Sequence, residues 1–242
     1  MCVIYFAYDA HPGRPLILAA NRDEFYDRPT APARFWDDHP DIYAGRDLVA
    51  GGTWLGITVS GRVAAVTNYR EPGASKGHRS RGDLVAGFLK GDESAEIYLA
   101  DVEQRRNEYS GFNLLVGEFT SSRRGLFYLS NRSGDGPRRL EPGVFGLSNH
   151  LLDTPWPKVR SGLERFGDLV KAPNLHPDQL FELLADESLA EDADLPDTGI
   201  GYEKEKLLSS IFIRTPVYGT RSSTVVTFDE SFEGKLVEKV FV

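Results

Sequence analysis

Two apolar runs at the start of the chain constrain its fold more than any other feature. Residues Cys2–Tyr8 are almost all apolar and rich in β-forming types, and Pro15–Ala20 reads PLILAA. The turn-forming segment DAHPG lies between them. Short apolar runs bounded by turn residues are typical of buried strands. We therefore expect the chain to open with a buried antiparallel hairpin.

The same hairpin pattern recurs along the chain. The expected pairs are Thr53–Val59 with Arg62–Asn68, Phe112–Gly117 with Gly125–Leu129, and Ser223–Phe228 with Lys235–Val242, and Val144–Leu147 is a further short strand. Arg28–Asp47 is Pro-rich and charged, so we expect a long surface loop there. Residues 182–205 are acidic and punctuated by Gly and Pro, which predicts a surface excursion.

Helices are expected between these groups of strands. Ser80 is a candidate cap for a helix over 83–89, and Ala95–Tyr109 is expected to be helical with Ile97, Leu99 and Val102 facing inward. Helical spacing also marks 159–170 and 180–184. Hairpins with intervening helices favour an α+β fold with antiparallel sheets covered by helices. Because no repeat or linker is visible, residues 1–242 are expected to form one domain.

Composition narrows the possible partners. The net charge of −8 repels phosphate backbones and anionic membrane surfaces, so nucleic acid is not the expected partner. The first residues lack a signal-peptide pattern, and no apolar run approaches the roughly 20 residues that span a bilayer. A cytoplasmic protein acting on a small molecule is expected, and oligomerisation is left open. The five histidines show no metal-ligand spacing and no phosphate-binding loop is present, so neither a metal nor a cofactor is expected.

Cys2 is the most informative single residue. It is the only cysteine and directly follows Met1, whose removal is expected because the next residue is small. The exposed α-amine would titrate near about 8 and could activate the adjacent thiol, with Arg22 and Arg221 stabilising the thiolate. One residue would then supply both nucleophile and base. The alternative is a small apolar side chain at the start of a buried strand.

The polar segment Asn21–Glu24 follows the second apolar run directly. The expected hairpin would bring it next to the start of the first strand. Asp23 could then hold an ammonium group, and Arg22 could bind a carboxylate or a developing oxyanion. The alternative is a solvated turn.

Other polar residues admit two interpretations each. Asn68 ends an expected strand, where its amide could donate to an oxyanion or simply form a turn. Arg221 precedes an expected strand and could instead form a surface salt bridge, and Trp54 could be a core residue. The basic cluster formed by Lys76, His78, Arg79 and Arg81 could hold an anionic group or be a solvated loop.

The string NRDE at 21–24, after a strand that begins Met-Cys, resembles the NRDE family, also called the transport and Golgi organisation protein 2 family. Further blocks share this resemblance at both ends of the chain: GGTWLG at 51–56, TNYR at 67–70, SRG at 80–82 and TRSST at 220–224. The family in turn resembles the cysteine branch of the N-terminal-nucleophile hydrolases, which includes penicillin V acylase and bile salt hydrolase. This resemblance implies a four-layer αββα sandwich of two mostly antiparallel sheets flanked by helices.

The resemblance also implies a set of site residues. Cys2 would be the nucleophile, Asp23 the anchor of its amine and Asn68 part of the oxyanion hole, while Asn149 and Arg221 would complete the catalytic set. The substrate-binding candidates are Arg22, Trp54 and Arg81. The sequence departs from the hydrolase branch at one point. There an arginine lies three residues before the aspartate, whereas here that position is Ala20 and Arg22 precedes Asp23 directly.

Two functions are the main candidates, and autocatalytic processing alone is a third alternative. The first is an amidohydrolase that cleaves a non-peptide C–N bond through a thioester. The second is a non-catalytic binding or trafficking protein on the same fold, since the resemblance also implies links to haem handling and acyl-lipid metabolism. Fold alone does not choose between them.

Overall fold

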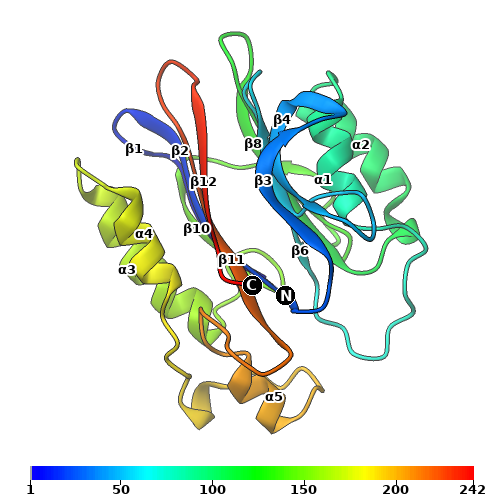
Figure 1. The fold of residues 1–242 in the computed structure, drawn as a ribbon, viewed down its shortest axis with the longest axis vertical. Helices are drawn as coiled ribbons and strands as arrows, with labels where there is room; N and C mark the ends of the chain where they lie inside the picture. Colours follow the sequence, from blue (N-terminus) through cyan, green and yellow to red (C-terminus); the bar gives the residue numbers. More distant parts are fainter. Residues whose placement is uncertain (1) are drawn as a thin grey trace.

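The computed structural model describes residues 2–242, and these form two antiparallel sheets packed face to face (Figure 1). The five-stranded sheet has the order β10-β1-β2-β11-β12. Its strands are β1 (Cys2–His11), β2 (Arg14–Phe25), β10 (Gly143–Leu147), β11 (Tyr218–Phe228) and β12 (Gly234–Val240). The seven-stranded sheet runs in sequence order from β3 to β9. Its strands are β3 (Thr30–Trp36), β4 (His39–Asp47), β5 (Leu55–Thr58), β6 (Arg62–Asn68), β7 (Phe112–Phe119), β8 (Arg124–Ser130) and β9 (Arg138–Arg139).

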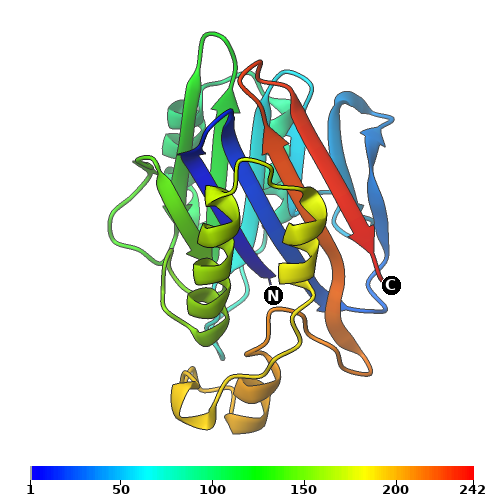
Figure 2. The same cartoon turned by 90° about the vertical axis from the view of Figure 1, so that its left-hand side faces the viewer.

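Helices cover the outer face of each sheet, so the molecule has four layers. The helices α3 (Pro157–Lys171) and α4 (Pro177–Leu184) pack on the five-stranded sheet, as Figure 2 shows. The helices α1 (Gly82–Lys90) and α2 (Ala95–Gln104) pack on the seven-stranded sheet (Figure 1). The short helix α5 (Tyr202–Leu207) lies beyond the end of the sheets. The expected α+β class and αββα layering are confirmed.

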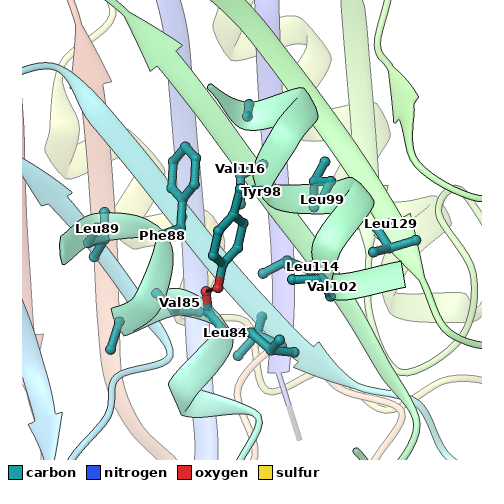
Figure 3. Packing of buried hydrophobic residues seen from close by; sticks show 14 of the residues in the cluster. Leu84, Val85, Phe88, Leu89, Tyr98, Leu99, Val102, Leu114, Val116 and Leu129 are labelled. Atoms are coloured by element: carbon teal, nitrogen blue, oxygen red, sulfur yellow. Dashed lines mark hydrogen bonds between the residues drawn. The ribbon is translucent and has the colours of Figure 1, made fainter. Parts of the chain in front are cut away.

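Each interface between layers is an apolar core. Between the sheets, alternate residues of β1 and β2 such as Ile4, Phe6 and Leu18 are fully buried. On the outer side of the seven-stranded sheet, Figure 3 shows Phe88 of α1 and Tyr98 of α2 packed over the strands. The Tyr98 hydroxyl donates to the Leu84 carbonyl (2.7 Å), which joins the two helices. Successive side chains of a strand point to opposite faces of its sheet, so one strand contributes both to the core between the sheets and to the core under the helices.

The opening hairpin is confirmed, and it is longer than its apolar runs. The strand β2 continues through the polar segment Asn21–Glu24, and Asn21, Arg22 and Asp23 are buried there. The interpretation of this segment as a solvated turn is therefore wrong. Its neighbours β1 and β11 pair with it on both sides, so the segment lies inside the five-stranded sheet and not at an edge.

The segment Arg28–Asp47 is not a loop. It forms the hairpin of β3 and β4 at one edge of the seven-stranded sheet, and Trp36, Ile42 and Ala44 are buried. An edge hairpin buries only one face, so its few apolar residues are separated by polar ones. Because of this mixture of polar and apolar residues, the segment Arg28–Asp47 was expected to be a loop and not a pair of strands.

Two helix details differ from the expectation. The helix that begins at Ala95 ends at Gln104 and is followed by a 3-10 turn, Arg106–Glu108. Leu99 and Val102 face the core as expected, but Ile97 is 61% exposed. Ser80 does not cap α1 directly, since Arg81 occupies the N-cap; the Ser80 hydroxyl instead accepts from the Gly82 N–H (3.2 Å).

The acidic segment after α4 does run over the surface, through a second 3-10 turn (Asp192–Asp194) and α5. It returns inward at Ile211 and Ile213, which are buried. Within residues 2–242, no helix has both the length and the apolar character needed to cross a membrane.

Candidate functional site

The strand β1 of the five-stranded sheet begins at Cys2, toward the lower end of that sheet in Figure 1. Cys2 pairs with Arg22 of β2, and Arg22 pairs on its other side with Ser222 of β11. The Ser148 hydroxyl, just after β10, donates to the Cys2 carbonyl (3.0 Å). Three neighbouring strand ends therefore fix the position of Cys2.

A cavity of about 390 Å³ opens beside Cys2, and we call it the Cys2 cavity. It lies where β2, the segment before β5, the end of β6 and the start of α1 meet. Of the residues expected at the site, it is lined by Cys2, Arg22, Asp23, Trp54, Asn68 and Arg81. The structure thus brings together six residues that are spread over 80 positions of the sequence.

The protonation of Cys2 differs from the expectation. Burial raises the pKa of the Cys2 thiol, and the Asp23 carboxylate adds to this rise, while the Arg22 guanidinium opposes it. The expected thiolate stabilisation by arginine is therefore present for Arg22 but does not prevail over burial. A base that removes the thiol proton is needed for Cys2 to act as a nucleophile.

Asp23 directly follows Arg22, the β2 partner of Cys2, and is 1% exposed. Its carboxylate accepts from the Thr220 hydroxyl (2.7 Å), and its backbone carbonyl accepts from the Tyr218 hydroxyl (3.2 Å). Burial raises the pKa of the Asp23 carboxyl, and the ammonium of Lys158 opposes this rise. A carboxylate so placed can hold a cation at the start of β1.

Asn68 and Asn149 meet across the two sheets. Asn68 ends β6 and lines the Cys2 cavity, whereas Asn149 follows β10 and is fully buried. The Asn149 side-chain amide donates to the Asn68 carbonyl (3.0 Å), and the Arg70 N–H donates to the Asn149 carbonyl (2.7 Å). Asn149 therefore holds Asn68 in place, and it is not itself among the lining residues.

The structure does not bring the Arg221 guanidinium to the Cys2 cavity. Arg221 lies inside β11, at the register shift between Thr220 and Ser222. Its guanidinium is buried and donates to the backbone carbonyls of Phe25 and Arg28. Arg221 is thus placed to order the connection from β2 to β3.

Arg22 and Arg81 are the two guanidinium groups best placed to bind a ligand. The Arg22 guanidinium stacks 4.1 Å from the centre of the Trp54 ring and donates to the Thr30 hydroxyl (3.1 Å). Arg81 donates to the Gly111 carbonyl (3.1 Å). Among residues 2–242, no carboxylate forms an ion pair with either of them. Both positive charges are therefore available to an anionic ligand group.

The basic cluster next to α1 also reaches the cavity. Lys76 and Arg79 line it with Arg81, while His78 is not among the lining residues. Arg79 is paired with Glu108 (3.1 Å), so its charge is partly balanced. Three of the four members line the cavity, and Lys76, His78 and Arg79 are exposed to solvent, so the structure is compatible with both interpretations of this cluster.

Sequence reasoning missed two groups of residues at the site. Arg28 and Asp47 line the cavity as an ion pair (2.7 Å), and they lie in the hairpin that looked like a loop. Lys158 of α3 is 2% exposed, lowers the pKa of the Asp23 carboxyl, and has its own pKa raised by Asp23 and Cys2. A signal for Lys158 was available, because Lys158, Gly162 and Phe166 follow each other at four-residue spacing on one helix face. Within the described residues, no group of three His, Cys, Asp or Glu side chains could hold a metal ion.

The fold is similar to that of a known amidase. The Caenorhabditis elegans N-acylethanolamine-hydrolyzing acid amidase ortholog aligns over 100% of both chains with a TM-score of 0.59 and 10% sequence identity. At this identity the likeness shows a shared fold and nothing further.

Sequence comparison identifies much closer relatives. The human transport and Golgi organization protein 2 homolog is 40% identical over 95% of this chain and 89% of its own length. The Drosophila melanogaster transport and Golgi organization protein 2 is 31% identical over 99% of this chain and 92% of its own length. The profile of the family described as Transport and Golgi organisation 2 matches residues 1–242. The chain belongs to this family.

Proposed function

We propose that the protein is an N-terminal-cysteine amidohydrolase that cleaves a C–N bond in small substrates carrying an anionic group. The observation that carries this proposal is the meeting of Cys2, Asp23 and Asn68 at one cavity. These are a nucleophile, an anchor for its amine and an amide donor, and such sets define acyl-transfer sites. The fold that the chain shares with an amidase is consistent with this chemistry but does not establish it.

In the proposed mechanism, removal of Met1 gives Cys2 a free α-amine. The amine accepts the thiol proton, and the sulfur attacks the substrate carbonyl to give a tetrahedral oxyanion. Asn68 donates to this oxyanion. The C–N bond then breaks, and the leaving amine takes the proton from the α-ammonium. Water, deprotonated by the same α-amine, hydrolyses the remaining thioester and releases the acid.

The substrate class follows from the charges around the cavity. Arg22 and Arg81 face it without an ion-pair partner among the described residues, and Lys76 adds a third positive charge. A guanidinium binds a carboxylate or phosphate with two parallel hydrogen bonds. We therefore infer that the substrate places an anionic group within reach of Arg81 while its carbonyl lies at Cys2.

A matched pair of amides tests this function. An N-acylglycine and an N-acylethanolamine with the same acyl chain differ at the leaving group chiefly by a carboxylate. The wild-type protein should hydrolyse the acylglycine faster, and Cys2→Ala should remove this activity. Arg81→Met should raise KM for the acylglycine about tenfold or more, whereas Arg79→Met, which removes a guanidinium already paired with Glu108, should have a smaller effect. Equal hydrolysis by wild type and Cys2→Ala would contradict the proposal.

A second candidate is a ligand carrier on the same fold. A second groove of about 320 Å³ does not include Cys2 in its lining. It is lined mainly by apolar residues, including Phe35, Ile57 and Leu236. Such a groove favours an apolar ligand such as an acyl chain or haem. A carrier would bind either ligand equally well in wild type and in Cys2→Ala, unless the thiolate ligates the haem iron. Unchanged binding together with no hydrolysis by the wild type would favour the carrier over the hydrolase.

A further inference from the structure

A buried lysine on α3 lies behind the Cys2 site. The side chain of Lys158 is 2% exposed, and among the described residues its ammonium nitrogen has no hydrogen-bond partner. A buried charge without a partner is costly, so a protein retains one where it serves a purpose or where a neighbouring charge offsets it. The mechanism proposed above makes no use of this group.

The sheet register places Lys158 and Asp23 on the same side of the five-stranded sheet. Side chains alternate along β2, so Asn21 and Asp23 face one way and Arg22 the other. The Asn21 amide donates to carbonyls of Leu184 and Ile211, which belong to the helical layer. Asp23 therefore faces the layer that contains α3, and it is buried there beside Lys158.

The first turn of α3 is held firmly against β1. The Tyr5 hydroxyl donates to the Lys158 carbonyl (2.6 Å), and Gly162, one turn later, leaves room for the Tyr5 ring. Tyr5 is itself fully buried. This packing fixes the backbone from which the Lys158 side chain extends toward the start of β1.

The other charged groups around Lys158 are largely balanced by partners of their own. Arg70, which follows β6, forms an ion pair with Glu205 of α5 (2.6 Å). On the far side of α3, the cavity that Lys158 also lines contains two further ion pairs, Arg160 with Asp194 and Arg165 with Asp186. From β1 and β2, Cys2 and Asp23 act on the protonation of Lys158, and the Tyr5 phenol contacts its backbone carbonyl. The Asp23 carboxylate is thus the counter-charge that the structure offers to Lys158.

We propose that Lys158 is a positioning residue of the Cys2 site, whose ammonium partly offsets the Asp23 carboxylate and so raises the fraction of the Cys2 α-amine that is unprotonated and basic. This inference rests on the proposed function, since it requires Cys2 to have a free amine. A carboxylate beside an amine favours the ammonium form, which cannot accept the thiol proton. A second cation near the same carboxylate offsets this effect because it repels the ammonium.

The protonation of Lys158 is compatible with this role. Burial lowers the pKa of Lys158 to about 8, and Asp23 opposes the decrease. Near neutral pH the lysine therefore carries its proton, and the positive charge is present where the inference requires it.

Titration of the α-amine tests the inference without any substrate. In a Cys2→Ala background, which removes the thiol, competitive acetylation with acetic anhydride followed by mass spectrometry of the N-terminal peptide gives the midpoint of the α-amine. Adding Lys158→Met should move the midpoint to higher pH and slow acetylation at pH 7 about tenfold, which corresponds to one pH unit. Lys158→Arg should keep the midpoint near that of the background because it keeps the charge. Lys171→Met, at the exposed end of α3, should leave it unchanged.

An unchanged midpoint in Lys158→Met would overturn the inference. Intact mass of each sample shows separately whether Met1 has been removed. A retained Met1 would contradict the proposed function as well, whereas a processed chain with an unchanged midpoint would contradict the role of Lys158 alone. If Lys158→Met does not fold, a ¹⁵N NMR titration of the lysine side chains in the wild type takes its place. A Lys158 that is neutral at pH 7 would then overturn the inference, and a protonated one would support it.

Discussion

The side-chain amide of Asn149 donates to the backbone carbonyl of Asn68 over 3.0 Å and so joins the ends of two strands from opposite sheets. Asn149 follows β10 of the five-stranded sheet, and Asn68 ends β6 of the seven-stranded sheet. Cys2 begins the strand next to β10. The distance between the nucleophile on one sheet and the proposed oxyanion donor on the other therefore depends on this bond.

This arrangement predicts that Asn68 and Asn149 affect turnover without affecting the reactivity of the thiol. Asn68→Ala should lower kcat for amide hydrolysis roughly a hundred- to a thousandfold, because one oxyanion donor is lost. Asn149→Ala should cause a smaller decrease, since Asn68 remains but is less well held. Alkylation of Cys2 by iodoacetamide passes through no oxyanion, so its rate should stay within about twofold of wild type in both variants. A parallel loss of alkylation would show that these residues act on the thiol instead.

The contact between α3 and β1 gives a prediction on stability. A methyl group at Gly162 would collide with the Tyr5 hydroxyl, whose hydrogen bond holds Lys158. Gly162→Ala should therefore lower the free energy of unfolding by about 1–3 kcal/mol. Gly167 lies on the same helix with open space around it, so Gly167→Ala should raise the free energy of unfolding by about 0.5–1 kcal/mol. Urea unfolding of the two variants measures both values, and equal effects would contradict the packing described.

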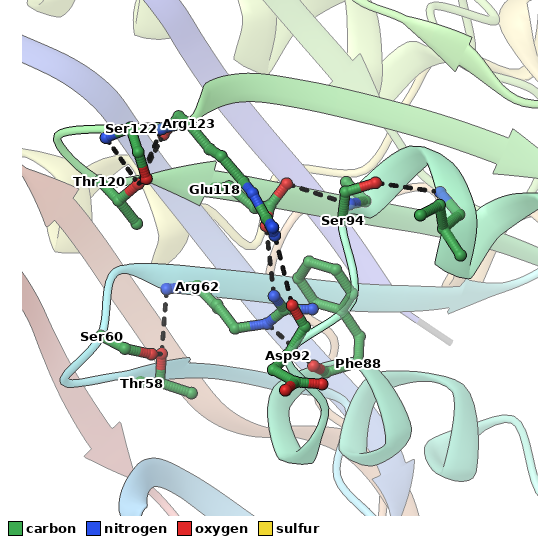
Figure 4. Close-up of polar contacts among 12 residues, drawn as sticks. Thr58, Ser60, Arg62, Phe88, Asp92, Ser94, Glu118, Thr120, Ser122 and Arg123 are labelled. Atoms are coloured by element: carbon green, nitrogen blue, oxygen red, sulfur yellow. Dashed lines mark hydrogen bonds and ion pairs between the residues drawn. The ribbon is translucent and has the colours of Figure 1, made fainter.

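A buried ion pair near the turn between β5 and β6 predicts a larger loss. The Arg62 guanidinium bonds to the Glu118 carboxylate (3.2 Å) and the Phe88 carbonyl (3.0 Å), and it stacks on the Phe88 ring (Figure 4). Glu118→Ala leaves the Arg62 charge buried without its partner, and we expect a loss of about 3–5 kcal/mol in urea unfolding. Arg123 also contacts Glu118 (3.1 Å) but is half exposed, so Arg123→Ala should cost less than about 1 kcal/mol. A small effect of Glu118→Ala would show that Arg62 finds another partner or reaches solvent.

The parts of the fold that the sequence predicts are those with continuous apolar runs. The strands β1, β2, β6 and β7 each contain a continuous apolar stretch that is buried on both faces, and these stretches mark the strands clearly. The edge hairpin of β3 and β4 buries one face, and its charged residues concealed it. The end of β2 could not be recognised as a strand for another reason. Its buried residues are polar because they form hydrogen bonds and line the site, and do not pack in the apolar core.

The positions of site residues were predictable from the sequence where the pairing of neighbouring strands alone determines them. A hairpin must bring Asp23 beside Cys2, and family resemblance added Asn68. The direction in which the Arg221 side chain points could not be predicted from the sequence. The register shift in β11 aims Arg221 at backbone carbonyls, and no pattern in the sequence marks such a shift. Lys158 lies on a helix whose contact with β1 depends on the tertiary packing of Tyr5 against Gly162.

The central claim, that Cys2 is an N-terminal nucleophile, can be tested by trapping its acyl form. The purified protein is treated with p-nitrophenyl acetate and then examined by intact mass and by peptide mapping. We expect a chain that begins at Cys2 and carries one acetyl group on the Cys2 sulfur, which hydroxylamine removes because it cleaves thioesters and not amides. Cys2→Ala should stay unlabelled under the same conditions. A wild-type chain that retains Met1, or one whose Cys2 stays free while other residues are acetylated, would contradict the claim.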